Sequence, residues 1–186
     1  KRDLDGLVAD AHTAAGGGTA ADTGTALHEL TEAIDSGRTL SVVPERWTGH
    51  LDAYMAATAG LEMLEMEQFI VNDAVQAAGT FDRLVRLPDG RVVVADLKTG
   101  AHDPKYPLGV TTQIAVYANG SRYDPATGER SPIHPDLDLT TGLLIHMPAK
   151  AAPSCALYAL DLVQGWGAAR LAIAVRDTRK AKNLCT

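Results

Sequence analysis

The segment GTFDRLVRLPDGRVVVADLKTG, residues 79–100, decides the fold. Its two halves are runs of apolar and β-branched residues separated by LPDGR at 87–91, a pattern that predicts a β-hairpin. Pro88 suits position i+1 of a type I turn and Asp89 suits position i+2. Gly90 can adopt the left-handed conformation that closes a three-residue loop with a G1 bulge.

The length of this loop determines which side chains face each other across the hairpin. With a three-residue loop, Leu87 faces Arg91 and, further along, Asp82 faces Asp96 on one face of the sheet. Directly opposed side chains lie about 5 Å apart, so two like charges destabilise the sheet unless positive charge lies between them. A two-residue Asp-Gly loop would instead place the two aspartates on opposite faces.

Two interpretations of the aspartate pair are open. In the functional one, Asp82 and Asp96 bind a hard divalent cation, and Lys98 on the same face holds a phosphate oxygen or a nucleophilic water. In the structural one, both are solvated charges at the ends of strands. We favour the functional interpretation because the flanking runs are almost continuously apolar, and an unpaired carboxylate is costly in a buried strand.

The rest of the chain predicts an α/β fold with a mixed sheet, in a single domain over residues 1–186. Cap residues, apolar spacing and β-branched runs predict the elements. Helices are expected from Asp22 to a stop at Gly37, after Pro44 (with Trp47, Leu51, Tyr54 and Met55 on its apolar stripe), at 107–118 and at 164–180; strands at 67–71, 79–87, 92–98, 142–147 and 155–162; and a long surface loop at 119–138.

The Gly-rich segment AAGGGTAA at 14–21 predicts a loop that follows a short leading helix. A phosphate-binding loop is the alternative interpretation. We favour a plain connection, because the segment lacks the Lys-Ser/Thr pair of a P-loop.

Composition limits the possible classes of protein. The chain has 186 residues, 46% of them hydrophobic and 22% charged, which is typical of a globular domain. We expect no membrane span, because no window approaches the roughly 18 continuous apolar residues that a span requires. The formal net charge of −6 argues at first against a nucleic-acid partner, but it is unevenly distributed: residues 1–75 are strongly acidic and residues 76–186 are slightly basic.

The two cysteines, Cys155 and Cys185, form neither a CxxC pair nor a closely spaced framework. Zinc, iron–sulfur and secreted disulfide-scaffold classes therefore lack their usual ligands, and we expect a reduced, cytoplasmic setting. We also expect no signal peptide, since no charged-then-apolar leader follows Lys1.

Several separated motifs together resemble one family. They are GTALHE at 24–29, Glu67, GTFD at 79–82, DLKTG at 96–100 and QIAVY at 113–117. In this order the motifs are similar to the series of the RecB-like branch of the PD-(D/E)XK nuclease superfamily, which includes CRISPR-associated RecB-like exonucleases and many phage exonucleases. Each motif alone is weak, but five in order around a hairpin are fairly specific.

The resemblance implies a restriction-endonuclease-like core of α-β-β-β-α-β type and a set of roles. It implies that His28, Asp82, Asp96 and the Leu97 carbonyl bind metal, and that Lys98 orients the attacking water. It implies support from Glu67, and DNA contact or bracing of the lysine by Gln113 and Tyr117. The second acidic position, often Glu in this family, is Asp96 here. Many relatives have four cysteines for an iron–sulfur cluster; this chain has two, so we expect no cluster.

The implied activity is metal-dependent hydrolysis of phosphodiester bonds in DNA. Carboxylate ligands favour Mg²⁺, and an imidazole ligand makes the site softer, so Mn²⁺ should support activity at least as well. The resemblance favours an exonuclease of recombination, repair or phage replication, acting in the cytoplasm or, if phage-encoded, in that of the host. It leaves open a homo-oligomer or a recombination partner protein. The alternatives are an inactive DNA-binding or scaffolding subunit with the same fold, and an enzyme acting on another phosphate ester.

The segment RDTRKAK at 176–182 is the best candidate for contacts with DNA phosphates. Its basic residues also complement the dipole at the end of the last predicted helix, so a solvated helix terminus is an equally good interpretation. The candidate residues are Arg176, Arg179, Lys180 and Lys182.

Overall fold

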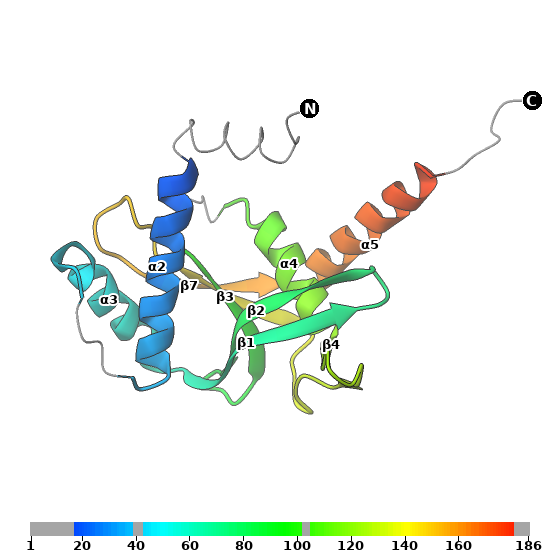
Figure 1. Ribbon diagram of the computed structural model, residues 1–186, viewed down its shortest axis with the longest axis horizontal. Helices are drawn as coiled ribbons and strands as arrows, with labels where there is room; N and C mark the ends of the chain where they lie inside the picture. The colour runs from blue at the N-terminus through cyan, green and yellow to red at the C-terminus, as the bar shows by residue number, and fades with distance from the viewer. Residues whose placement is uncertain (1–16, 39–42, 102–104, 181–186) are drawn as a thin grey trace, which may run out of the picture. The chain divides into compact units, whose positions relative to one another are not determined.

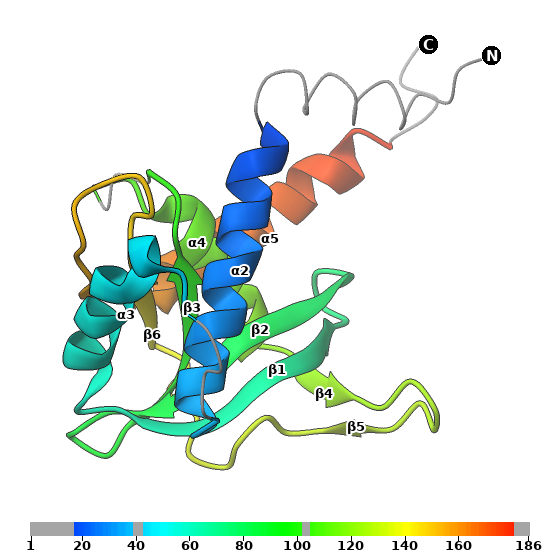
Figure 2. The same cartoon turned by 60° about the vertical axis from the view of Figure 1, so that its left-hand side comes forward.

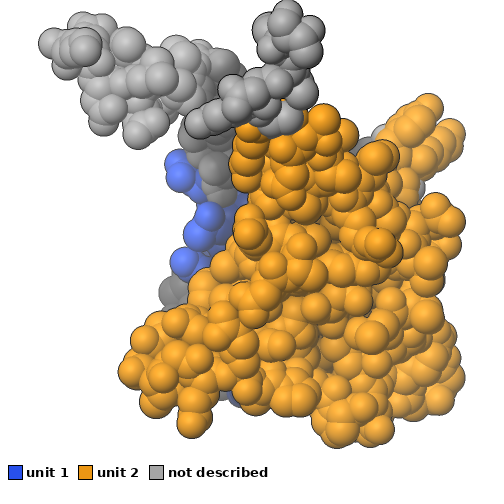
Figure 3. Space-filling view, turned by 90° about the vertical axis from the view of Figure 1, so that its right-hand side faces the viewer, with its two compact units in different colours: residues 1–57, 98–102, 146–156 blue, residues 58–97, 103–145, 157–186 orange. Residues whose placement is uncertain are grey.

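The computed structural model describes residues 17–38, 43–101 and 105–180 (Figure 1). The predicted leading helix, Lys182 and Cys185 lie outside this range. Contacts group the chain into two compact units, coloured in Figure 3. Unit 1 takes residues 1–57, 98–102 and 146–156, and unit 2 takes residues 58–97, 103–145 and 157–186.

Unit 1 contains the first two helices. They are α2 (Gly17–Asp35) and α3 (Glu45–Thr58). The Tyr54 hydroxyl, on a ring that is fully buried, donates a hydrogen bond of 2.7 Å to the Asp35 carboxylate and so joins α3 to the end of α2. Both helices confirm the helical spacing seen in the sequence, and Gly37 follows α2 with the positive φ of 66° expected of a helix stop.

Two details of the predicted helices are wrong. The helix α2 begins at Gly17, so residues 17–21, predicted as loop, are helical. The two alanines and the helix that follows outweigh the low helix propensity of the glycines. Met55 was placed on the apolar stripe of α3 but is 44% exposed, and the buried position beside Trp47 is taken by His50, which contacts the Trp47 ring edge-on.

The sheet of the structure has seven strands in the order β5-β4-β1-β2-β3-β6-β7. Antiparallel pairing joins β5 to β4, β4 to β1, β1 to β2 and β2 to β3. The strands are β1 (Glu62–Asn72), β2 (Ala77–Arg86), β3 (Val92–Lys98), β4 (Ser121–Tyr123), β5 (Arg130–Ser131), β6 (Thr141–His146) and β7 (Ala156–Asp161).

The strand predictions are confirmed for β2, β3, β6 and β7 to within one or two residues, whereas the other three differ. Strand β1 begins five residues earlier than predicted, because its first half alternates glutamate with apolar residues. Strands β4 and β5 lie inside the segment 119–138 that was predicted as loop. They are two or three residues long and polar, and β4 is held by pairing with β1, which local sequence does not reveal.

The main core of unit 2 lies between the sheet and the helices α4 (Leu108–Ala118) and α5 (Leu162–Thr178). Val110 and Ile114 of α4, Leu84 of β2, and Val92 and Val94 of β3 belong to one buried cluster. The two helices approach closely where a Cβ on Gly165 would lie 2.5 Å from the Thr111 carbonyl oxygen.

No helix in the described part of the chain is both long and apolar enough to cross a membrane.

The turn between β2 and β3 has the predicted three-residue loop. The Leu87 N–H donates to the Arg91 carbonyl oxygen at 2.8 Å, the Gly90 N–H donates to the Leu87 carbonyl oxygen at 2.9 Å, and Gly90 has φ 89°. The paired residues run from Arg86 with Val92 to Arg83 with Ala95, as the three-residue loop requires. The register of the hairpin is therefore confirmed, and the two-residue alternative is excluded.

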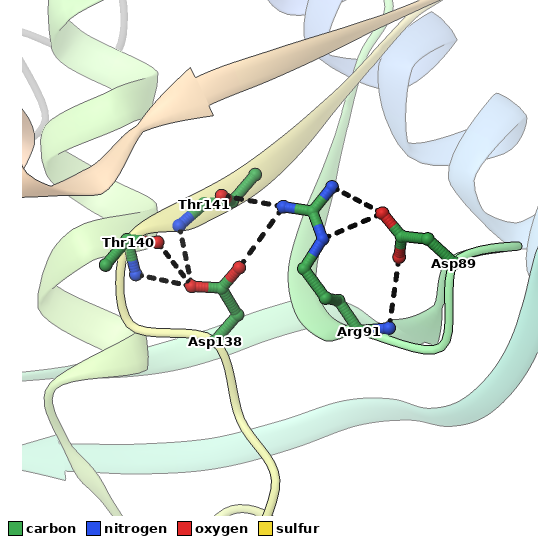
Figure 4. Close-up of polar contacts among 5 residues, drawn as sticks. All are labelled: Asp89, Arg91, Asp138, Thr140 and Thr141. Carbon is green, nitrogen blue, oxygen red and sulfur yellow. Dashed lines mark hydrogen bonds and ion pairs between the residues drawn. The ribbon is translucent and has the colours of Figure 1, made fainter.

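A polar network holds the end of this hairpin (Figure 4). The Arg91 guanidinium bridges the carboxylates of Asp89 and Asp138, at 2.7 Å and 3.3 Å, and also donates to the Thr141 hydroxyl. Burial raises the pKa of Asp138, but hydrogen bonds from Thr140 and Thr141 outweigh this and lower it to about 2. The network ties the β2–β3 turn to the segment that enters β6.

Candidate functional site

The two predicted acidic residues lie at the end of the β2–β3 hairpin that is distant from the turn. The ladder pairs Arg83 with Ala95, and its next step places Asp82 opposite Asp96. In this register the two carboxylates occupy one face of the sheet, at the spacing of directly opposed side chains.

A side-chain hydrogen bond fixes the orientation of Asp82. Its Oδ2 accepts from the Leu97 N–H at 2.8 Å, so the carboxylate is anchored to the main chain of β3 directly beside Asp96. Leu97 itself is fully buried. One oxygen of Asp82 thus has a fixed position, and its half-buried carboxylate is oriented by the neighbouring strand.

Asp96 is 2% exposed, and so is an acidic residue in the interior of the sheet. Alternation along β3 places it on the same face as Val92 and Val94, the face that packs against α4. Burial of a carboxylate is costly unless it is compensated by hydrogen bonds or positive charge. The position is therefore unusual for a purely structural aspartate.

Lys98 is the last residue of β3, two positions after Asp96, and is half-buried in unit 1. Its carbonyl oxygen accepts from the Met147 N–H at 2.9 Å, and the next carbonyl, of Thr99, accepts from the Ala149 N–H. The segment at the end of β3 and the segment after β6 therefore run in the same direction, as in parallel strand pairing. The segment after β6 is thereby aligned with the lysine motif.

This alignment places Lys150 beside the lysine motif, a residue that sequence reasoning did not single out. A cavity of about 160 Å³ in unit 1 is lined by Thr23, Thr99, Gly100 and Ala101 together with Ala149 and Lys150. Local sequence could not predict this position of Lys150, because it depends on the segment after β6 running alongside the end of β3. Lys150 is exposed and carries positive charge at the rim of this cavity.

His28, a predicted metal ligand, lies on α2 in unit 1 next to the fully buried Leu27. Its side chain is half-buried, and its carbonyl oxygen accepts a hydrogen bond from the Thr31 hydroxyl at 2.9 Å. The position of His28 on a helix is as expected from the sequence.

Glu67 lies on β1, which pairs with β2 as expected of a meander. Met66 pairs with Arg83 and Gln68 with Phe81, so Glu67 lies opposite Asp82 in the register. It is exposed and has a positive φ of 53°, an uncommon conformation for a residue with a side chain. The strand is locally distorted at the position that faces the acidic pair.

Gln113 and Tyr117 share a face of α4, as their spacing predicts, and the Gln113 amide donates to the Tyr117 hydroxyl at 3.2 Å. A Cβ placed on Gly79 of β2 would lie 2.7 Å from that hydroxyl and 2.9 Å from the ring. The tyrosine therefore lies directly over Gly79, three residues before Asp82. Glycine at this position leaves room for the ring.

The donor set suits a hard divalent cation, because opposed carboxylates are the oxygen ligands that Mg²⁺ and Mn²⁺ take. Among residues 17–38, 43–101 and 105–180, however, no three His, Cys, Asp or Glu side chains are arranged to hold a metal ion. The acidic site therefore consists of two opposed aspartates, Asp82 and Asp96, with Glu67 as a neighbour. The three side chains do not form a three-ligand cluster.

The candidate DNA-contact residues on α5 differ from one another. Arg176 donates to the Val75 carbonyl oxygen at 3.4 Å and to the Gln76 side chain at 3.0 Å, both in the β1–β2 turn. The ammonium group of Lys180 lies 3.2 Å from the Asp177 carboxylate, and Arg179 is the exposed C-cap residue of α5. Arg176 therefore has a structural role, while Arg179 and Lys180 remain accessible.

Comparison with known proteins gives one family match. A model described as the PD-(D/E)XK nuclease superfamily matches residues 35–124, a range that includes both aspartates and Lys98. No curated protein matches the chain. The match supports the superfamily, whose members are nucleases that generally use divalent metals such as Mg²⁺ or Mn²⁺. The α/β architecture described above is consistent with the fold of that superfamily, so the predicted fold class is confirmed.

Proposed function

We propose that this chain is a divalent-metal-dependent deoxyribonuclease of the RecB-like branch of the PD-(D/E)XK superfamily, whose model matches residues 35–124. The register of the β2–β3 hairpin carries the proposal, because it places Asp82 opposite Asp96 and anchors Asp82 beside it through the Leu97 N–H. We further propose an exonuclease that acts on DNA in the cytoplasm during recombination, repair or phage replication, alone or with a partner protein of that process.

In this proposal Asp82, Asp96 and the Leu97 carbonyl hold the metal, with His28 as the additional ligand that the resemblance implies. When bound, the ion supplies charge neutralisation at the scissile phosphate and a water that is nucleophilic near neutral pH. Lys98 provides a fixed positive charge that orients the attacking water.

The remaining residues position the substrate. Glu67, opposite Asp82 in the register, supports the acidic pair. Gln113 and Tyr117, joined by a hydrogen bond, contact the DNA or brace the lysine. Arg179, Lys180 and Lys182 contribute attraction to phosphates, and Lys150, beside the lysine motif, is a further candidate for a phosphate contact.

The test is cleavage of end-labelled single- and double-stranded DNA in Mn²⁺, Mg²⁺ or EDTA. We expect cleavage with either metal, none in EDTA, and its loss in Asp96→Asn and Lys98→Ala. Asp124→Asn is the matched control, because Asp124 is an exposed turn residue whose carboxylate contacts only its own loop among the contacts described. The pattern of labelled products distinguishes removal of terminal nucleotides from internal cleavage.

Metal binding is tested separately by thermal unfolding. An ion that binds the folded state raises the unfolding temperature by mass action, so Mn²⁺ should stabilise the wild type and not Asp96→Asn. DNA binding without cleavage in any buffer would overturn the proposal in favour of an inactive scaffolding subunit. Hydrolysis of a small phosphate ester with intact DNA would favour an enzyme acting on another substrate.

A further inference from the structure

The solvent-facing side of α5 carries one stripe without charged side chains, flanked by the exposed Arg170 and Asp177. Successive residues of a helix are rotated by about 100°, so positions 163, 167, 171, 174 and 178 form one stripe. They are Val163, Gly167, Leu171, Ala174 and Thr178, and all five are exposed. Val163 is 60% and Leu171 67% exposed, so the stripe contains large side chains that the described residues of the chain leave exposed.

The opposite side of α5 already packs against the protein. Leu162, Gly165 and Ala169 are buried, and Trp166 packs against the core cluster of unit 2. The exposed stripe therefore does not serve the core. In Figures 1 and 2 the C-terminal half of α5, orange to red, extends beyond α4.

We propose that this stripe is a homodimer interface, in which α5 packs antiparallel against α5 of a second copy. The reason is self-complementarity, which a two-fold interface requires. With the two-fold axis at Leu171, each Leu171 faces the other, and Gly167 faces Val175 of the second copy. Val175 is 53% exposed, and the glycine provides the space that this side chain needs.

Charges at the ends of the helix match in the same arrangement. Asp161, the exposed N-cap residue, lines a hollow with Thr140, Thr141 and Val163 at the start of α5. Antiparallel pairing places Arg179 and Lys180 of the second copy beside Asp161. Parallel pairing would instead bring the two basic ends together. Antiparallel helix dipoles add to the preference.

The interface is a single pair of helices, so its area falls at the low end for specific association, and we expect a dissociation constant on the order of micromolar. The inference does not rest on the acidic hairpin, since none of its residues takes part. Arg179 and Lys180 are shared with the proposed DNA contact, so the dimer is tested in the absence of DNA.

The first experiment is sedimentation equilibrium of the full chain over roughly a hundredfold range of concentration. We expect a shift from 19.6 kDa towards twice that mass. Leu171→Glu places two carboxylates at the axis and should raise the dissociation constant at least about tenfold. Met55→Glu is the matched control: Met55 is 44% exposed on α3, takes no part in the proposed interface and should leave the dimer intact. Equal unfolding temperatures of the two variants exclude misfolding as the cause.

The second experiment tests the direction of pairing, in a background with Cys155→Ser and Cys185→Ser. A short bis-maleimide should link Leu171→Cys to itself, and Gly167→Cys to Val175→Cys in a mixture, but Gly167→Cys much less to itself. A chain that stays monomeric throughout the range would overturn the proposal and leave the stripe to a different protein. So would a dimer that Leu171→Glu does not weaken, or cross-linking without this pattern.

Discussion

The Asp82 carboxylate accepts a 2.8 Å hydrogen bond from the N–H of Leu97, the residue between Asp96 and Lys98. At this point a side chain, rather than a main-chain carbonyl, links β2 to β3. The acidic residue therefore combines two functions, because it holds the two strands together and carries one of the proposed metal ligands.

These two functions can be separated by substitution. Asp82→Asn keeps an oxygen that accepts from Leu97 but removes the charge, so we expect near wild-type stability with cleavage reduced by roughly two orders of magnitude or more. Asp82→Ala removes the acceptor as well and should also lower the free energy of unfolding by about 1–2 kcal/mol. Urea unfolding and nuclease assays of both variants test this. Equal unfolding free energies would show that the hydrogen bond adds no stability.

Gly79 should not tolerate any side chain. Gly79→Ala places a Cβ 2.7 Å from the Tyr117 hydroxyl and 2.9 Å from its ring, so the tyrosine must shift, and we expect its hydrogen bond with Gln113 to weaken. We expect a stability loss of about 1–3 kcal/mol and weaker DNA binding. Gly109→Ala is the control, since a Cβ there meets no atom within 4 Å. If Gly79→Ala and Tyr117→Phe bind DNA as tightly as the wild type, the α4 pair is not a DNA contact.

The stability of the protein should fall in acid partly through Asp138. In the folded protein the pKa of Asp138 is about 2, below its ordinary value of 3.8. A carboxylate with a lowered pKa stabilises the fold fully above its unfolded pKa, and this contribution is lost as the pH falls through the folded pKa. The loss therefore lies between about pH 4 and pH 2 and amounts to about 2 kcal/mol at most.

The variant Asp138→Asn tests this dependence. It should be less stable than the wild type at pH 7, and the difference should shrink as the pH approaches 2. Asp136→Asn, at a nearby exposed position, is the control in the same urea titrations. A difference that stays constant from pH 7 to pH 2 would contradict the assignment.

The basic residues at the end of α5 should separate into two groups. Arg176→Ala loses the hydrogen bonds to Val75 and Gln76, so we expect a stability loss of about 1 kcal/mol. Arg179→Ala should leave stability unchanged but weaken DNA binding and reduce its salt dependence by about one phosphate contact. Binding measured over a series of salt concentrations, together with thermal unfolding, tests both. An unchanged salt slope in Arg179→Ala would favour a plain solvated helix end.

The parts of the fold that local sequence predicts are those with local causes. The turn LPDGR determines its own loop length, so the register that opposes Asp82 and Asp96 follows from the sequence. Strands β4 and β5 and the position of Lys150 depend on pairing with distant segments, which no local pattern contains. The exposed stripe of α5 has no signature in the sequence, because apolar residues on both sides of a helix leave no periodicity.

The three-residue loop at Gly90 also constrains how this protein can change over evolution. Removal of one residue from the loop would turn every side chain of β3 to the other face of the sheet. Asp96 would then no longer lie on the same face as Asp82, although neither residue had been substituted. Insertion or deletion of a single residue in this exposed turn should therefore separate the two aspartates of the remote acidic pair. The length of the turn should be inherited together with the aspartates, even where its amino acids vary.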